Sequence, residues 1–377
     1  MKTIQLHKKI NKDWEYLSPK LELKQPLVLV FGNRYFLESK TIYQEIQSLF
    51  PDGHIIFGST SGDIALNVVT DDTITITAIE FEKTEFVIKS CNVLTSGFDS
   101  YKTGQQLVRQ FPVENLKFIF VVSEGSNING SQLTLGMNST VPKNVLITGG
   151  LCGDGDRFEK TLASYAENPK EGEMVAIGFY GQTLEVSSSI HGGWIPFGPE
   201  RIVTKSKDNI LFELDEKPAL NLYKKYLGDK SIDLPSAALV YPLNVKSENE
   251  KQSFVRTILN IDETQNSMIL AGDIPLNSKV QLMMTNVDGI VSASELAAKQ
   301  ALEGRKAKPE LALLVSCIGR KLVLDQRVEE EVEEVREVIG NNVTIGGFYS
   351  YGEIAPFYNE INCQLQNQTM TITLISE

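Results

Sequence analysis

The chain has 377 residues, 42% of them hydrophobic, which is typical of a globular protein with room for two or three domains. Asp and Glu (48) outnumber Lys and Arg (36), so the net charge is −12, and a nucleic-acid partner, which needs a basic surface, is not expected. The longest apolar runs have the length of strands, so membrane insertion is not expected either. The N-terminus lacks the apolar core of a signal peptide, and we therefore expect a cytoplasmic protein.

The cysteines and histidines argue against both a disulfide scaffold and a metal site. No Cys-x-x-Cys pair occurs among the four cysteines, which is typical of a reducing compartment; they are Cys91, Cys152, Cys317 and Cys363. The three histidines show no His-x-x-x-His spacing. We therefore predict neither a bound metal nor a cofactor.

The segment 1–25 is polar and mixed in charge, and we expect it to form a leader that packs late or frays. A buried strand is predicted over residues 27–31, and the spacing of apolar residues predicts a helix over residues 38–50. A second strand, residues 54–57, leads into a Gly-Asp loop. Runs rich in β-branched residues between 64 and 93 then predict an antiparallel meander.

The same order of elements then occurs a second time. A strand over residues 118–122, a polar loop, a short helix and a strand over residues 145–147 lead to another Gly-Asp loop. Further strands are predicted between residues 160 and 190. Two glycines, two prolines and a tryptophan within residues 189–201 predict an irregular segment that crosses between domains.

A domain boundary is predicted after a helix over residues 218–227, because Pro218 suits the first helical position and Gly228 follows the helix end. The second domain is expected to start with a strand over residues 237–241. The predicted division has three parts: a leader, 1–25; an N-terminal domain, 26–228; and a C-terminal domain, 229–377.

A third strand, helix and strand occupy the end of the chain. The strand over residues 311–315 precedes a helix whose valines and Ile339 form one apolar stripe. We interpret the glutamates of that helix, among them Glu331, as a solvated face. The β-branched run that begins at Val343 then breaks into glycines, aromatic residues and a final Gly-Glu pair.

One pattern therefore recurs three times: a strand, a helical segment and a second strand that ends in a loop with Gly-Asp or Gly-Glu. The acids of these loops are Asp63, Asp154 and Glu353. Repeated β-α-β units that alternate with antiparallel meanders predict a mixed α+β fold of two domains, with mixed sheets flanked by helices. Equivalent loops could converge on one pocket.

Six short motifs resemble those of the FIST family, a sensory module of intracellular signal transduction. Three lie before Gly228 and three after it: G-G-L-C-G-D-G (149–155), G-W-I-P-F-G-P (193–199), L-D-E-K-P-A-L (214–220), A-G-D-I-P (271–275), C-I-G-R (317–320) and G-F-Y-S-Y-G-E-I (347–354). The chain departs from the family pattern at residues 123–125 and at Glu216. The resemblance implies a FIST N-terminal and a FIST C-terminal domain that sense a small ligand, with amino acids or their relatives as proposed ligands. Any output would pass to a separate signalling protein.

Arg320 and Glu353 are the first candidates for such a site, because a guanidinium can pair with a ligand carboxylate while a carboxylate receives an ammonium group. The full set of candidate ligand-binding residues is Arg320, Glu353, Tyr349, Tyr351, Cys317, Asp154 and His191. Each also has a structural interpretation. Arg320 can form an internal salt bridge, the acids can cap their own turns, and the tyrosines, Cys317 and His191 can serve in packing.

Two other functions stay open at this point. A hydrolase or transferase would use Cys317 or Cys152 as its nucleophile, and a ligand-free scaffold would use the acidic helix face. No recognisable catalytic constellation accompanies either cysteine, so we predict no catalytic residues and favour a sensor over an enzyme.

Overall fold

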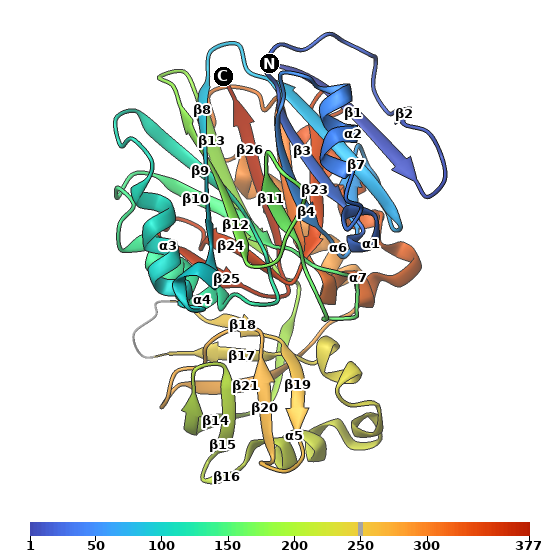
Figure 1. Cartoon of the computed structure of the whole chain (residues 1–377). Coiled ribbons are helices and arrows are strands. Elements are labelled where there is room, and N and C mark those ends of the chain that lie inside the picture. Colours follow the sequence, from blue (N-terminus) through green and yellow to red (C-terminus); the bar gives the residue numbers. More distant parts are fainter. Residues whose placement is uncertain (248–251) are drawn as a thin grey trace.

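The computed structural model describes residues 1–247 and 252–377, which form a large body of three six-stranded sheets and a smaller domain below it (Figure 1). The smaller domain is built mainly from residues 195–284 and contains the fourth sheet and helix α5 (Ala219–Leu227). The predicted mixed α+β class is confirmed. No helix among the residues described is long and apolar enough to span a membrane.

The three large sheets share one plan. The first has the order β11 (Ala163–Tyr165), β4 (His54–Ser59), β3 (Leu27–Gly32), β7 (Thr73–Glu80), β1 (Lys2–Lys9) and β2 (Glu15–Tyr16). The second has the order β25 (Cys363–Gln366), β24 (Gly352–Pro356), β10 (Leu146–Leu151), β9 (Leu116–Ser123), β12 (Glu173–Tyr180) and β8 (Glu85–Asn92). The third has the order β6 (Val68–Thr70), β5 (Asp63–Ala65), β23 (Thr344–Ser350), β22 (Leu311–Cys317), β26 (Met370–Ser376) and β13 (Glu185–His191).

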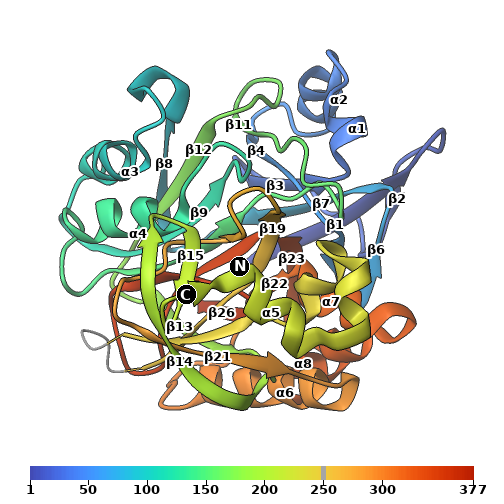
Figure 2. The ribbon, with the colours of Figure 1, turned by 90° about the horizontal axis from the view of Figure 1, so that it is seen from below.

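Each sheet has one parallel pair at its centre, and these pairs are the three β-α-β units expected from the sequence. The pairs are β3 with β4, β9 with β10, and β22 with β23. The helices lie outside the sheets on three sides when the molecule is seen from below (Figure 2). They are α1 (Arg34–Leu37) and α2 (Ile42–Leu49), α3 (Ser100–Arg109) and α4 (Gly130–Asn138), and α6 (Val287–Leu302), α7 (Ile318–Leu324) and α8 (Glu330–Ile339).

The strand after each Gly-acid loop leaves its own unit and joins the sheet of another. Strand β5 follows β4 but pairs with β23, β11 follows β10 but pairs with β4, and β24 follows β23 but pairs with β10. Each exchange places the new strand antiparallel to the last strand of the receiving unit. The three exchanges run in one direction around the body, so together they close a ring.

The inner faces of the three sheets meet in one apolar core rich in phenylalanine. Its aromatic members include Phe31 of the first sheet, Phe118, Phe120 and Phe179 of the second and Phe348 of the third. The outer faces pack against the helices in separate clusters, one for each sheet. Strands buried on both faces explain why the sequence shows continuous apolar runs there and no alternation.

Three local expectations are corrected by the structure. Residues 2–9, within the predicted leader, form β1, which pairs with β7 along its whole length because Ile4 and Leu6 alternate into the core. The segment predicted to be irregular, 189–201, belongs largely to β13 and to β14 (Ile195–Lys207), whose pairing shifts register between Phe197 and Arg201. The predicted strand over 237–241 is a 3₁₀ helix, Ser236–Val240, that follows Pro235.

The sheets also bear on the predicted division at residue 228. Strands β22 to β26 follow that point in the chain, yet they complete the second and third sheets beside strands that end at or before His191. The small domain is therefore inserted between β13 and α6, in the middle of the large body's sequence.

Gly149 in β10 is expected to tolerate no side chain, because a Cβ there would stand 2.0 Å from the carbonyl oxygen of Val121 in β9 and its φ is +147°. We expect Gly149→Ala to lower the free energy of unfolding by about 1–3 kcal/mol, measured by urea denaturation. Gly304→Ala is the matched control, since its φ is +72° but nothing lies within 4 Å of the added carbon. Equal losses in both variants would show that backbone strain, and not the contact with β9, limits this position.

Candidate functional site

The three Gly-acid loops, residues 59–63, 151–154 and 349–353, meet one another where the exchanged strands cross. The amide N–H of Gly153 donates to the Ser59 carbonyl at 3.0 Å, that of Ser61 to the Tyr349 carbonyl at 2.9 Å, and that of Tyr351 to the Leu151 carbonyl at 3.0 Å. Every loop thus bonds to both of the others. We call these three segments the acid loops.

Asp63 and Glu353 occupy similar positions in their loops, and both are buried. A hydroxyl three residues earlier donates to each carboxyl group, from Thr60 to Asp63 at 2.5 Å and from Ser350 to Glu353 at 2.7 Å. Burial outweighs these hydrogen bonds and raises the pKa of both carboxyl groups to about 7. The capping interpretation expects amide N–H donors from each acid's own turn. Asp63 instead accepts from hydroxyls, including that of Thr73, and the amide donor to Glu353 belongs to Thr369 in a different segment.

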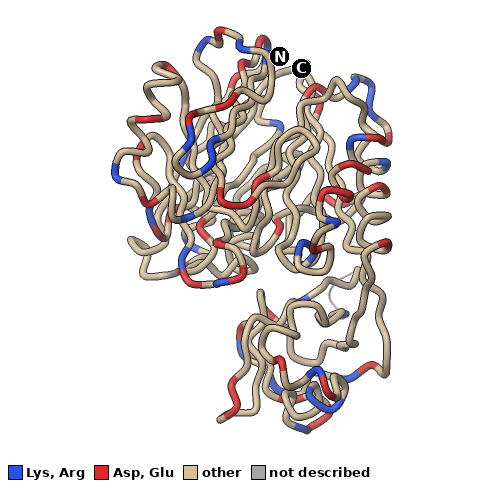
Figure 3. Tube along the Cα trace, turned by 90° about the vertical axis from the view of Figure 1, so that its right-hand side faces the viewer, with Lys and Arg blue, Asp and Glu red and all other residues tan. Residues whose placement is uncertain are grey.

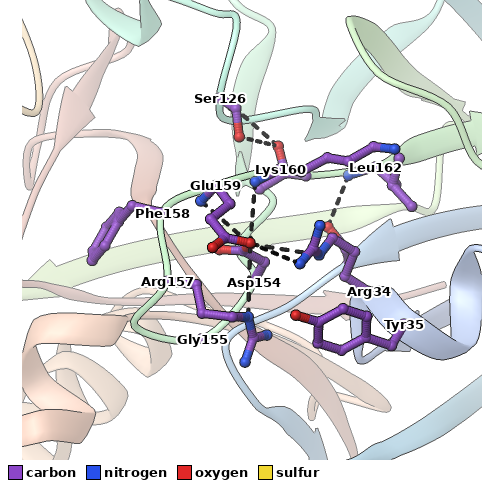
Figure 4. Close-up of polar contacts among 12 residues, drawn as sticks. Arg34, Tyr35, Ser126, Asp154, Gly155, Arg157, Phe158, Glu159, Lys160 and Leu162 are labelled. Atoms are coloured by element: carbon purple, nitrogen blue, oxygen red, sulfur yellow. Dashed lines mark hydrogen bonds and ion pairs between the residues drawn. The ribbon is translucent and has the colours of Figure 1, made fainter.

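Asp154 is 0% exposed and collects contacts from all three units; those with Arg34, Arg157 and Lys160 are drawn in Figure 4. Its Oδ2 accepts from the amide N–H of Lys160 at 3.2 Å and lies 3.6 Å from Nε of Arg34 and 3.8 Å from Nε of Arg157. Its Oδ1 accepts from the Tyr351 hydroxyl, which in turn accepts from the amide of the residue at 158. Asp154 therefore holds the segment 155–160 through its backbone and forms ion pairs with both arginines, without a hydrogen bond to either Nε.

Arg320 does not reach Glu353 and pairs instead with Glu331, and both side chains are 0% exposed. Its Nε and Nη2 donate to Oε2 of Glu331 at 2.9 and 2.6 Å, and Nη1 donates to the carbonyl of Gly192 at 2.5 Å. The interpretation of Glu331 as part of a solvated face is wrong, because it lies on the buried side of α8 next to Val332 and Val335. A ligand carboxylate could reach Arg320 only by displacing Glu331.

Tyr349 and His191 belong to the same buried network. The Tyr349 hydroxyl donates to Oε1 of Glu331 at 2.5 Å, and the backbone carbonyl of His191 accepts from Arg320 at 3.3 Å. The His191 ring lies 2.8 Å from the side-chain oxygen of Gln300. These residues join α6, α7 and α8 to the third sheet.

The cysteine candidates are poorly placed for nucleophilic chemistry. Cys152 and Cys317 are buried, and their burial raises the thiol pKa well above the ordinary value. A thiol held protonated is a weak nucleophile at neutral pH. Among the described residues, no group of three or more His, Cys, Asp or Glu side chains is arranged to hold a metal ion.

A polar cavity of about 390 Å³ opens beside the acid loops, and we call it the loop pocket. Its walls come from all three units: residues 60–63 and 70–72 of the first, 155–157 of the second, and parts of 318–328 of the third, with Asn33. The charged residues of the lining are Asp63, Asp71, Asp72, Asp156, Asp325, Arg157 and Lys321. None of the seven residues expected from the sequence lines it.

The two cations of the loop pocket differ in how they are held. Lys321 donates to the carbonyl of Ser61 at 2.8 Å and to the Asp71 carboxylate. The side chain of Arg157 is 31% exposed, and its guanidinium lies 5.1 Å from the ring centre of Tyr35, with Asp154 at its Nε. Figure 3 shows that acidic and basic residues are spread along the Cα trace of both the large body and the small domain. The sequence analysis does not identify Arg157 as a candidate. Its only indication in the sequence is that a basic residue stands three positions after a Gly-Asp pair.

Residues 26–217 match the FIST N domain, and residues 219–356 match the FIST C domain. The chain belongs to the FIST family. FIST domains are associated with sensing in signal transduction. The two matched regions share the second and third sheets of the large body, so the FIST N and FIST C regions of this chain fold together.

One curated relative is an uncharacterized protein of Methanocaldococcus jannaschii, 24% identical over 248 residues, which are 61% of this FIST chain and 44% of the relative. The chain thus matches less than half of that protein's length. Among solved structures, the crystal structure of cyanuric acid hydrolase from A. caulinodans aligns with a TM-score of 0.35 and 7% identity over 93% of this chain and 90% of that one. A TM-score this low transfers neither fold nor activity.

Proposed function

We propose that this FIST protein is a sensor that binds a small zwitterionic metabolite, such as an amino acid, in the loop pocket. The observation that supports the proposal is a single cavity in which an accessible guanidinium faces several carboxylates, built from loops of all three units. Its volume of about 390 Å³ lies within the range of roughly 300–1,000 Å³ typical of small-molecule sites.

The chemistry of the loop pocket suits both ends of a zwitterion. Arg157 offers a planar pair of N–H donors to a carboxylate, and its guanidinium lies beside the Tyr35 ring and the Asp154 carboxylate. The carboxylates of Asp72 and Asp156 can receive an ammonium group. Lys321 is already engaged with Ser61 and Asp71, so we assign it to positioning the first acid loop.

The residues expected from the sequence take supporting roles in this proposal. Asp154 forms an ion pair with Arg157, and Tyr351 holds Asp154. Tyr349 receives the amide contact of the first acid loop, and its ring centre lies 5.6 Å from the Lys321 ammonium. We further propose a cytoplasmic location, which four cysteines without disulfides support, and a separate signalling protein that receives the output.

The proposal is tested by isothermal titration calorimetry against a panel of amino acids. We expect at least one to bind saturably, and Arg157→Ala to weaken it at least about 10-fold, since a bidentate carboxylate contact is lost. Arg109→Ala, at an exposed position on α3, is the control and is expected to bind like the wild type.

Two results would contradict the loop pocket as the site. One is a folded wild-type protein that binds no member of the panel. The other is a ligand whose affinity is the same in Arg157→Ala and in the wild type.

A further inference from the structure

A second cavity, of about 470 Å³, lies between the large body and the small domain, and we call it the interdomain cavity. We propose that it is a separate ligand site, which takes a small organic amine with an apolar or aromatic body. The large body contributes residues 125–130, Leu151, Phe158, Glu159, Glu171 and Tyr351 to its lining. The small domain contributes Asn209, Leu259 and residues 270–272. The proposal does not depend on the loop pocket.

The apolar part of the lining is preorganised. Phe158 and Tyr351 stack with their ring centres 4.4 Å apart and their planes at 19°. The Tyr351 hydroxyl is held by Asp154 and by the amide of Phe158, so the pair cannot turn away without losing these contacts. Leu151, Leu270 and Tyr351 are buried behind the wall. The partly exposed ring of Phe158 therefore provides the surface for an apolar ring, and aromatic faces also attract organic cations.

The charged side chains of the lining are all acidic. Glu159 and Glu171 line the interdomain cavity, and no Lys, Arg or His occurs among its described lining residues. Each carboxylate also meets a basic side chain outside the lining, Arg34 at 3.1 Å from Glu159 and Lys160 at 3.5 Å from Glu171. Carboxylates are therefore the only charged side chains that the described lining brings to the cavity, which favours an amine over an anion.

The walls of the cavity are held by contacts within and between the two bodies. Asp273 of the small domain accepts from Asn129 at 2.7 Å and from Gln132 at 2.5 Å, both at the start of α4. On the large body, the buried Glu124 carboxylate accepts from the amide of Ser126 at 2.6 Å and from that of Asn127 at 2.9 Å. These hydrogen bonds hold the segments next to the lining in place on both bodies.

Benzylamine is a suitable probe, because benzoate has the same ring with the opposite charge. We expect benzylamine to bind saturably by ligand-observed NMR and calorimetry, and benzoate to bind at least about 10-fold more weakly. Ala271→Trp, at a partly exposed lining position, is expected to fill the cavity and weaken benzylamine at least about 10-fold. Glu171→Gln is expected to weaken it about 2- to 5-fold.

A control tests whether these effects are specific to the cavity. The exposed Glu114→Gln is expected to leave benzylamine binding unchanged, because Glu114 lies outside the described lining. The proposal is overturned if benzylamine fails to bind the folded wild type, if benzoate binds equally well, or if Glu171→Gln and a folded Ala271→Trp both bind like the wild type. Should Ala271→Trp not fold, Glu171→Gln alone decides, and unchanged binding in it overturns the proposal.

Discussion

Arg320→Met is expected to lower the free energy of unfolding by about 3–5 kcal/mol, because it leaves the Glu331 carboxylate buried without its cation. The loss extends beyond the ion pair, since Arg320 also donates to the Gly192 carbonyl at 2.5 Å and to the Ser294 hydroxyl at 2.6 Å. Urea denaturation followed by circular dichroism measures the change. A large value would fit a structural role for this arginine.

Two further variants show how much of this change in the free energy of unfolding comes from the buried charge. Arg320→Met combined with Glu331→Gln removes both charges and is expected to recover part of the loss, because no unpaired charge remains buried. Arg327→Ala removes an exposed arginine that pairs with Glu330 and Asp288, and a much smaller shift of the urea midpoint is expected. If Arg320→Met unfolded at the same urea concentration as Arg327→Ala, the buried pair would contribute little to stability.

A second large effect is expected from pH: the free energy of unfolding of the wild-type protein should fall as the pH rises from about 4 to about 7. Burial raises the pKa of Asp63 and of Glu353 to about 7, so the folded chain keeps two protons that the unfolded chain releases near the ordinary pKa values of 3.8 and 4.5. Because the folded state then binds more protons, the free energy of unfolding falls with pH over this window and levels off above it. The expected loss is about 4 kcal/mol for Asp63 and about 3 kcal/mol for Glu353.

Thermal unfolding between pH 4 and pH 8 measures this effect. The variant Asp63→Asn with Glu353→Gln cannot ionise at either position, and its melting temperature is expected to depend less on pH than that of the wild type. The neighbouring charges stay in place in this variant, Asp71 and Lys321 near Asp63 and Arg320 near Glu353. Glu114→Gln, an exposed carboxylate, is the control, and an equal pH slope in all three proteins would exclude the two buried acids as its source.

The sequence predicts the three β-α-β units well because their signals are local. Apolar runs of strand length, helical spacing and the recurring Gly-acid pair all lie within about 40 residues of one another in each unit. The exchanged strands escape prediction for the opposite reason. Strand β5 is only three residues long, and its partner β23 lies far along the chain. No residue pattern in β5 identifies β23 as the strand with which it pairs.

The candidate site was predicted less completely than the fold. The acid loops were found and do converge, but Asp63, Asp154 and Glu353 are buried, and they hold the loops in place. Arg157 follows no pattern in its loop. The burial of Glu331 can be predicted from helical spacing. It lies three positions after Val328 and four before Val335, on the buried stripe of its helix.

The exchange of strands around the large body has a consequence for synthesis on the ribosome. When the chain has been synthesised only as far as Lys217, strands β23 and β24 do not yet exist. Strand β5 then lacks its partner β23, and the edge of β10 that pairs with β24 is unpaired. The last strand, β26, must also enter the third sheet between β22 and β13, and the amino terminus lies 3.2 Å from the carboxylate of Glu377. Nascent chains therefore expose two unpaired sheet edges until residues 344–356 have been synthesised, and an unpaired strand edge is prone to aggregation.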